Sequence, residues 1–422
     1  MNKLNRYDKW YELIFLTKWF RLLVGVVCLV AVMFSIKSTL HQEFLTKESV
    51  RNSVVFLLFG YLFSDVLISR LSKFPGVVSV SYTVPVVLII YFLLFGVFFL
   101  YRFEYSRSLI IPSMFLIVFY SFAVSLIIRR YKVLKIAVVP YGDALRLTDL
   151  HGVSWRLLKK PSIDNVRYDA VVADFNHPMV GEWEKFLSDC ALSGLITINS
   201  LQLYESLEGR VKIGHLSEGQ VGSLNPPELY VLFKRIIDVV AVLLVFPIVL
   251  LVTLISAVII RLESPGNPFF VQKRVGLGGN EFKIFKLRSM CIDSEVDGAK
   301  FAASGDMRVT KFGKFIRKTR IDELPQFLNV LKGEMSLIGP RPEQKAFVSE
   351  FEKSIPFYNY RHVVRPGISG WAQVTHGYAA SEDETREKLE HDLYYIKHFS
   401  LWLDILIVFK TIHTMLTGFG AR

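Results

Sequence analysis

The sequence predicts a membrane protein of mixed class, α-helical with an α/β part. Four transmembrane helices precede a small Rossmann-like α/β domain and a mainly α-helical, monotopic domain with a proline-broken re-entrant helix. Three observations predict this. Four long apolar runs fill the first 130 residues, strands alternate with helices in the middle, and a proline-interrupted apolar segment opens the C-terminal half. We place the domains at 1–130, 131–225 and 226–422, which fits about 150 residues per domain.

The composition excludes intrinsic disorder as the overall state. Hydrophobic residues make up 52% of the 422, and the formal net charge is +12. This fraction is above the ~45–50% of soluble globular chains. Because the apolar residues also come in long runs, a purely soluble protein is not expected. The cysteines, Cys28, Cys190 and Cys291, lie far apart. They predict neither a disulfide framework nor a zinc site, and they favour a reducing compartment.

The four apolar runs are the predicted transmembrane helices. Runs 76–100 and 109–128 have no charged residue and match the ~20 residues that cross a bilayer. Runs 22–36 and 52–68 are shorter. The second of them contains Asp65, which we interpret as a snorkelling or helix-paired carboxylate.

Basic residues predict the orientation of the chain. Lysines and arginines are densest before the first run and after the fourth, so both ends are expected in the cytoplasm. These residues are Lys3, Arg6, Lys9, Lys18 and Arg21 on one side and Arg129, Arg130, Lys132 and Lys135 on the other.

The middle segment has the pattern of a parallel α/β domain. Apolar runs at 136–139, 168–175 and 194–200 predict strands, and 180–192 has helical periodicity. The turn after the first strand, "PYGDA", lacks the glycine fingerprint of dinucleotide sites. A scaffold or dimerisation domain is the preferred interpretation, and a homodimer through the N-terminal or middle domain stays open.

A fifth apolar segment, 236–260, contains Pro247 near its middle and Asp238 as its only charge. Proline removes a backbone hydrogen bond and favours a bend. Both flanks are basic, so a crossing would place a basic segment outside. We therefore predict a re-entrant helix over 234–261 that enters and leaves the same face. A kinked fifth span is the alternative.

An acidic pair, Asp322-Glu323, follows a basic segment. Residues 267–320 contain 12 Lys+Arg against 5 Asp+Glu. Helical spacing after the pair, with Gly333 to end the helix, makes Asp322 the expected N-cap, ionised by the helix dipole. One interpretation is that Asp322 only caps the helix. The other is that Asp322 is a carboxylate nucleophile beside cations that bind phosphate, and that Glu323 holds Mg²⁺. The spaced apolar residues are Leu324, Phe327, Leu328 and Leu331.

The C-terminal run 400–416 is amphipathic. We expect an interfacial helix anchored by Trp402 and Lys410, with a buried core helix as the alternative.

Several long motifs occur in one order: "FFVQKRVG", "FKIFKLRSM", "IDELPQFLNVLKGEMSLIGPRP", "RPGISGWAQV" and "DLYYI". With them, residues 231–422 resemble the monotopic phosphoglycosyl transferases of bacterial polysaccharide synthesis, also called polyprenyl-phosphate hexose-1-phosphate transferases. The first 230 residues look like the N-terminal part of the large-type members. Many relatives have Ser before the helix-breaking proline, whereas this chain has Phe246.

The resemblance implies a bacterial inner-membrane enzyme with its catalytic domain on the cytoplasmic face. It implies transfer of a sugar 1-phosphate from a UDP-sugar to undecaprenyl phosphate, release of UMP, and an aspartyl-phosphosugar intermediate on Asp322. This reaction initiates exopolysaccharide, capsule or O-antigen synthesis. The lipid bilayer is a further partner, nucleic acid is not, and the sugar is not revealed.

The expected site combines Asp322 and Glu323 with Mg²⁺ as cofactor. Arg317 matches the phosphate-contacting arginine of the family. Further phosphate-binding candidates are Lys273, Arg274, Lys286, Arg288, Arg341 and Arg365.

Two other classes of protein stay in view. A polytopic prenyl-phosphate transferase would need many more spans. A non-enzymatic membrane anchor would use the same basic residues for anionic lipid and would release no UMP.

Overall fold

The computed structural model describes residues 17–39, 48–75, 79–131, 133–163, 166, 168–215, 225–290, 308–376 and 382–417. Cys291 and the basic residues Lys3, Arg6, Lys9 and Lys132 lie outside them. The chain divides into two compact units, Met1–Glu208 and Gly209–Arg422. This division comes before the domain boundary at 225 that the sequence predicts.

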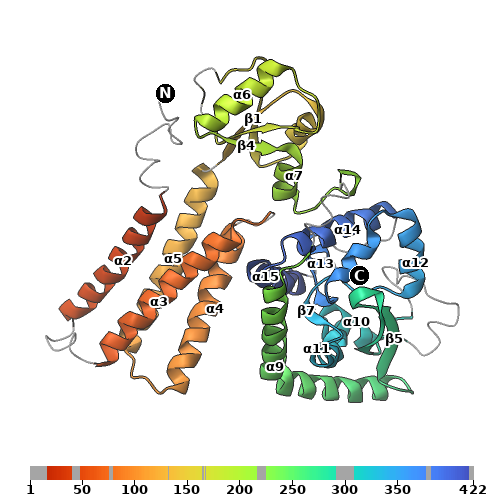
Figure 1. Cartoon of the computed structure of the whole chain (residues 1–422). Coiled ribbons are helices and arrows are strands. Elements are labelled where there is room, and N and C mark those ends of the chain that lie inside the picture. Colours follow the sequence, from red (N-terminus) through yellow and green to blue (C-terminus); the bar gives the residue numbers. More distant parts are fainter. Residues whose placement is uncertain are drawn as a thin grey trace. The chain divides into compact units, whose positions relative to one another are not determined.

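Five helices among the described residues are long and apolar enough to cross a membrane, and four of them lie in the first unit. These four helices of the first unit confirm the four predicted apolar helices, and they run side by side (Figure 1). Phe92, Phe115 and Phe119 are exposed on the bundle, as expected for lipid-facing positions, whereas Phe56 and Leu109 are buried inside it. The helices are α2 (Lys18–Thr39), α3 (Glu48–Leu71), α4 (Ser79–Leu100) and α5 (Arg107–Tyr131).

Polar groups in the bundle find partners within it. Asp65 on α3 lies 3.7 Å from the ammonium of Lys18 on α2, so the predicted helix pairing of this carboxylate is confirmed. The hydroxyl of Tyr120 donates to the carbonyl oxygen of Arg21 at 2.6 Å. Gly60 lets the ring of Tyr91 approach closely, because a Cβ atom there would stand 2.4 Å from a ring carbon.

The rest of the first unit contains a four-stranded parallel sheet in the order β2-β1-β3-β4. The sequence predicts three of these strands and misses β2, a short edge strand of mixed polarity. Alternate side chains pack on opposite faces, as expected for strands covered on both sides. The strands are β1 (Leu134–Val138), β2 (Val153–Leu157), β3 (Ala170–Ala173) and β4 (Ile196–Asn199).

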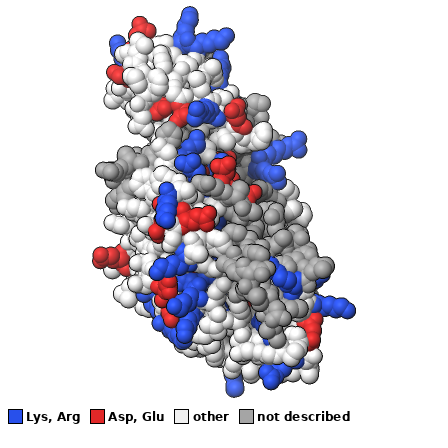
Figure 2. Space-filling view, turned by 90° about the vertical axis from the view of Figure 1, so that its right-hand side faces the viewer, with Lys and Arg blue, Asp and Glu red and all other residues white. Residues whose placement is uncertain are grey.

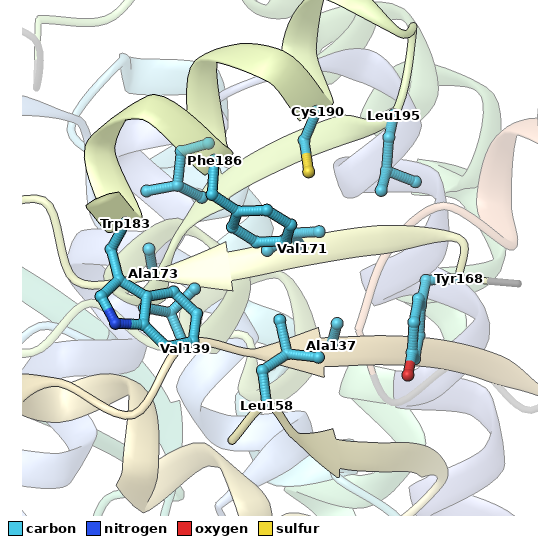
Figure 3. Close-up of a cluster of buried hydrophobic side chains, with 11 residues drawn as sticks. Ala137, Val139, Leu158, Tyr168, Val171, Ala173, Trp183, Phe186, Cys190 and Leu195 are labelled. Atoms are coloured by element: carbon cyan, nitrogen blue, oxygen red, sulfur yellow. The ribbon is translucent and has the colours of Figure 1, made fainter. Parts of the chain in front are cut away.

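One face of this sheet is covered by α6 (Gly181–Leu192), which confirms the predicted helix. In this core, Phe186 of α6 packs over Val171, and Trp183 of α6 lies beside Ala173 and Val139 (Figure 3). The other face packs against η2 (Gly142–Asp149) and α7 (Ser200–Glu208). At the end of β1, the Asp174 carboxylate accepts a hydrogen bond from the backbone N–H of Asp143 at 2.9 Å.

The second unit is built on α9 (Glu228–Glu263), a 36-residue helix with Pro247 inside it. Figure 1 shows two straight arms of α9 joined by a sharp bend. Val242 and Phe246 pack on an apolar cluster around Met335 before the bend, and Ala257 and Ile260 pack on a second cluster after it. Both arms therefore contact the same compact unit.

Short elements follow α9. The antiparallel hairpin β5–β6 is one that the sequence did not predict. Strands β7 (Ser336–Ile338) and β8 (Gly367–Ser369) pair in parallel. The remaining elements are η3 (Ile213–His215), β5 (Phe269–Val275), η5 (Leu277–Gly279), β6 (Glu281–Leu287), α10 (Lys311–Lys318), η6 (Ile321–Gln326), α11 (Phe327–Lys332), α12 (Lys345–Ser354), η7 (Tyr358–Val363), α13 (Trp371–Thr375), α14 (Glu382–Lys397) and α15 (Leu401–Thr417).

The C-terminal helix α15 has a core face and an apolar exposed face. Leu403, Leu406 and Ile407 are fully buried, whereas Val408 and Ile412 are exposed. The ammonium of Lys410 lies 5.0 Å from the centre of the Trp371 ring. One side of α15 is therefore packed as the alternative prediction, a buried core helix, expects.

Candidate active site

The acidic pair lies in a short 3-10 helix, η6, directly after α10. Thr310 caps α10 by accepting a hydrogen bond from the N–H of Gly313 at 2.9 Å. Arg320 then turns the chain with a left-handed φ of 59° and occupies the N-cap position of η6. The prediction that Asp322 is the N-cap is therefore wrong. The helix η6 begins at Ile321, whose side chain packs in the cluster of Ile260 and Ile316, so Asp322 lies inside its first turn.

The rest of the predicted helix is confirmed as α11. Gly333 ends it with a left-handed φ of 86°, as the sequence predicts. Arg235 of α9 donates to the carbonyl oxygens of Val330 and Leu331 in the last turn of α11, and Val330 also accepts from the N–H of Gly333 at 3.0 Å. Arg365 donates from Nε to the carbonyl oxygen of Gly333 at 3.0 Å. Arg365 thus contacts the end of the helix rather than the acidic pair.

Glu323 is buried and forms the centre of a group of cations. Its Oε1 lies 3.1 Å from Nη1 of Arg341, 3.4 Å from Nζ of Lys286 and 3.8 Å from Nη1 of Arg320. Burial alone would raise the pKa of Glu323, but these cations outweigh it and lower the pKa to about 2. Burial also disfavours the charged form of Lys286 and lowers its pKa, although the negative charge of Glu323 acts in the opposite direction.

Asp322 has a different environment from its neighbour. Its side chain is buried, and Oδ1 has no hydrogen-bond partner among the described residues. Burial, followed by the charge of Glu323, raises the pKa of Asp322 to about 6. The expected stabilisation of ionised Asp322 by a helix N-terminus is wrong, because burial dominates. The result is a desolvated carboxylate beside positive charge, an arrangement suited to attack on a phosphate.

Asn329 joins the pair to the strand that supplies Lys286. This fully buried amide donates to the carbonyl oxygen of Lys283 at 2.7 Å and accepts from the N–H of Phe285 at 3.1 Å. It thereby fixes α11 against β6, which carries Lys286.

The predicted phosphate-binding residues separate into different places. Lys286 and Arg341 lie at the acidic pair. Arg274 lies nearby on β5, where it donates to the carbonyl oxygen of Pro342 at 3.3 Å and pairs with Glu343 at 3.7 Å.

Three other predicted residues, all within the described part of the chain, make no hydrogen bond or ion pair with the acidic pair. Arg288 donates to the carbonyl oxygens of Ser264 and Pro265 after α9. Lys273 is exposed and pairs with Glu281 at 3.6 Å. Arg317 lies half-buried on α10 and makes no ion pair with any described residue.

The sequence did not single out Arg320 or Asn329. Arg320 stands three residues before Glu323, a spacing that places two helical side chains together, and this signal could have identified it. A buried Asn in an apolar run gives no comparable signal. On the face that Figure 2 shows, Lys and Arg lie in groups beside Asp and Glu, so this face is not one uniform cationic surface.

No group of three or more His, Cys, Asp or Glu side chains suited to a metal occurs among the described residues. Mg²⁺, however, is commonly held by one or two carboxylates together with substrate phosphates and water. The adjacent carboxylates of Asp322 and Glu323, with an unpartnered buried oxygen on Asp322, fit a Mg²⁺ ion that substrate phosphates share.

Comparison with known proteins identifies the family. The family model of bacterial sugar transferases matches residues 229–418. A UDP-N-acetylgalactosamine-undecaprenyl-phosphate N-acetylgalactosaminephosphotransferase of Aeromonas hydrophila is 54% identical over 364 residues, 86% of either chain. A UDP-glucose:undecaprenyl-phosphate glucose-1-phosphate transferase of Xanthomonas campestris is 39% identical over 54% of this chain and 46% of the relative. An Escherichia coli protein of that description is 41% identical over 43% of this chain and 39% of the relative. With its membrane-type helices and its buried carboxylate pair, the chain therefore belongs to the bacterial sugar transferase family of undecaprenyl-phosphate sugar phosphotransferases.

Proposed function

We propose that this chain transfers a sugar 1-phosphate from a UDP-sugar to undecaprenyl phosphate and releases UMP, the initiating step of bacterial exopolysaccharide, capsule or O-antigen synthesis. The observation that carries the proposal is the buried, unpartnered oxygen of Asp322 beside three cations gathered by Glu323. The names of the relatives supply the two substrates.

The reaction takes two displacement steps at one phosphorus atom. First, an oxygen of the Asp322 carboxylate attacks the phosphorus that carries the sugar. The bond from this phosphorus to the bridging oxygen breaks, and UMP leaves with that oxygen and the electron pair. Second, an oxygen of undecaprenyl phosphate attacks the phosphorus of the aspartyl-phosphosugar, and the Asp322 carboxylate is released.

Charge neutralisation is the task of the surrounding residues. Lys286, Arg341 and Arg320 provide positive charge where phosphate oxygens collect negative charge, in a site shielded from water. Glu323 keeps these three side chains together. A bound Mg²⁺ would add neutralisation of the phosphates, held by Asp322 and Glu323. Arg317 on α10, which makes no ion pair with a described residue, would contact a phosphate of the substrates.

We propose UDP-N-acetylgalactosamine as the donor. The relative of that name matches 86% of this chain, whereas the Xanthomonas and Escherichia glucose-1-phosphate transferases match about half of it or less.

The membrane arrangement follows from α9. We propose that α9 is re-entrant, with its bend at Pro247 in the bilayer and the catalytic unit on the cytoplasmic face of the inner membrane. Support comes from the sharp bend (Figure 1) and from the packing of both arms on one compact unit. The acidic pair then lies next to the second arm, through the contact of Ile321 with Ile260. A site near the interface meets a soluble donor and a lipid acceptor without any crossing.

The experiment is a single-turnover assay. Purified protein is mixed with UDP-N-acetylgalactosamine labelled at the sugar-bearing phosphate, without a lipid acceptor. We expect up to one equivalent of UMP and retention of the label on the protein, and undecaprenyl phosphate should then remove the label. If neither UDP-N-acetylgalactosamine, UDP-N-acetylglucosamine, UDP-glucose nor UDP-galactose yields UMP even with the acceptor, the protein is no phosphoglycosyl transferase and the anchor alternative gains support.

A further inference from the structure

Behind Arg341 lies a buried charged network that the two displacement steps do not use. Arg361 of η7 donates from Nη2 to the backbone carbonyl oxygen of Arg341 at 2.8 Å and to Oδ2 of Asp392 at 3.0 Å. Its Nη1 donates to the hydroxyl of Tyr358 at 2.6 Å. Arg361 is 4% exposed and Asp392 on α14 is 1% exposed. The backbone of Arg341 is thus tied to α14 through one guanidinium group.

The same helix holds the chain two residues further on. Lys388, one helical turn before Asp392, forms an ion pair and a hydrogen bond with Glu343. Residues four apart on a helix lie on one face, so one side of α14 holds both ends of the segment 341–343. From β5, the N–H of Val275 donates to the carbonyl oxygen of Glu343 at 2.9 Å.

We propose that Asp392, acting through Arg361, is a positioning residue for the reaction: it fixes the backbone of Arg341 so that the guanidinium reaches Glu323 beside the nucleophile. The inference rests on the proposed function. Arg341 meets Oε1 of Glu323 at 3.1 Å, and a displacement of about 1 Å in such a group can cost 10²-fold in rate. This role accounts for Asp392, which opens the "DLYYI" motif.

A purely structural role is the competing explanation, and a double-mutant cycle separates the two. Asp392→Asn should lower kcat for UMP release by roughly 10- to 100-fold, with a smaller effect on the KM for the UDP-sugar. In an Arg341→Ala background, the same Asp392→Asn change should cost less than about twofold, because the group it positions is gone. An equal loss in both backgrounds would overturn the positioning role.

The matched control is Glu390→Gln on the same helix. Glu390 is 13% exposed and pairs with Arg210 at 3.9 Å, away from segment 341–343. Glu390→Gln removes a carboxylate charge from the same helix, as Asp392→Asn does. Its effect on kcat should be small, and equal in the wild-type and Arg341→Ala backgrounds. Tyr358→Phe, which removes only a hydroxyl contact of Arg361, serves as the milder variant if Asp392→Asn folds poorly.

Hydrogen exchange gives a readout that does not need activity. Amides in segment 336–344 should exchange faster in Asp392→Asn than in the wild type, and Glu390→Gln should leave them unchanged. Unchanged exchange in Asp392→Asn and Tyr358→Phe would overturn the inference even if UMP is released normally. A wild type that releases no UMP would refute the proposed function instead, while faster exchange would still show that α14 holds this segment.

Discussion

At the scale of residues, Asp322 and Glu323 are adjacent carboxylates whose environments separate their pKa values. Both are buried, but the cations contact Glu323 and leave Oδ1 of Asp322 without a partner among the described residues. Such a separation is how a site assigns different tasks to like groups. Glu323 organises positive charge, and Asp322 is the candidate nucleophile.

The raised pKa of Asp322 predicts a pH dependence of the first step. Because only the ionised carboxylate attacks, the single-turnover rate of UMP release should fall about tenfold per pH unit below about pH 6 and level off above it. Rapid-quench measurements between pH 5 and 8 test this. A rate that is flat down to pH 5 would contradict it.

Unfolding should not mimic that profile. The pKa of Glu323 is lowered in the folded state, so its ion pairs contribute full stability above the unfolded value of about 4.3. This contribution is lost progressively as the pH falls from there through about 2. Ionisation of Asp322, by contrast, costs stability as the pH rises through about 6. Circular dichroism over the same pH range is the control.

Replacing the nucleophile should separate chemistry from folding. Asp322→Asn keeps size and shape, and no hydrogen bond to Oδ1 is lost. We expect turnover to fall by more than about a thousandfold, as for other removed nucleophiles, with no label retained on the protein. The midpoint of thermal unfolding should be near that of the wild type. Near-native turnover would show that Asp322 is not the nucleophile.

Arg317 and Arg320 should behave differently when each is replaced. Arg317 makes no ion pair with a described residue, so Arg317→Ala should leave the unfolding temperature unchanged while lowering kcat/KM by roughly 10²–10³-fold if it contacts phosphate. Arg320→Gly relieves the left-handed backbone but removes a cation from Glu323. It should lower kcat/KM too. Full activity of Arg317→Ala would contradict a phosphate contact of Arg317 and leave Arg320 as the arginine of this segment that supports the reaction.

At the scale of elements, the long apolar helix α9 packs beside the element that contains the acidic pair. Its first arm is held by a buried network in which Lys234 and Tyr230 contact the Asp404 carboxylate of α15 at 2.7 and 2.6 Å. Asp238, the only charge in the apolar segment, accepts from the hydroxyl of Ser336 at 2.6 Å. The charged residues of this arm therefore face protein partners, as expected for ionisable groups within a membrane segment.

A re-entrant α9 predicts the side on which α12 lies. In a variant without native cysteines, Lys353→Cys on exposed α12 should resist a membrane-impermeant maleimide in intact cells and react after permeabilisation. Tyr101→Cys, which follows α4 and is 73% exposed, is the matched position expected outside. Labelling of Lys353→Cys from outside would establish a fifth crossing and refute the re-entrant arrangement.

At the scale of the whole molecule, the compact unit suggests where an independent catalytic part begins. Gly209 accepts a hydrogen bond from the Trp371 indole at 2.7 Å, the N–H of Val211 donates to the carbonyl oxygen of Glu390 at 3.0 Å, and Ile213 is buried. These contacts precede the boundary at 225 that the sequence predicts.

The N-terminal residues should be dispensable for chemistry. A truncated protein that begins at Gly209 should release UMP at a rate within about tenfold of the full chain in lipid. One that begins at Pro226 should unfold at a lower temperature, since it loses those buried contacts. UMP assays and thermal unfolding of both proteins test this. A folded but inactive 209–422 protein would give the first unit a role in catalysis.

The sequence alone determined the parts that depend on local pattern. Apolar length predicts the four N-terminal helices, because crossing a bilayer requires about 20 apolar residues whatever the surroundings. Gly333 predicts the end of α11 because few other residues adopt its left-handed φ. The ordered motifs were enough to identify the family.

Which charges meet depends on how distant parts of the chain pack together. Of the basic candidates, Lys286 and Arg341 reach Glu323, Arg365 contacts the end of α11, and Arg320 joins the group unpredicted. Asp322 is no helix cap, because η6 begins at Ile321 with Arg320 in the N-cap position. Ion pairs depend on where strands, turns and helices from distant parts of the chain converge. A carboxylate's pKa depends on the burial and charge created there, which neither spacing nor composition encodes.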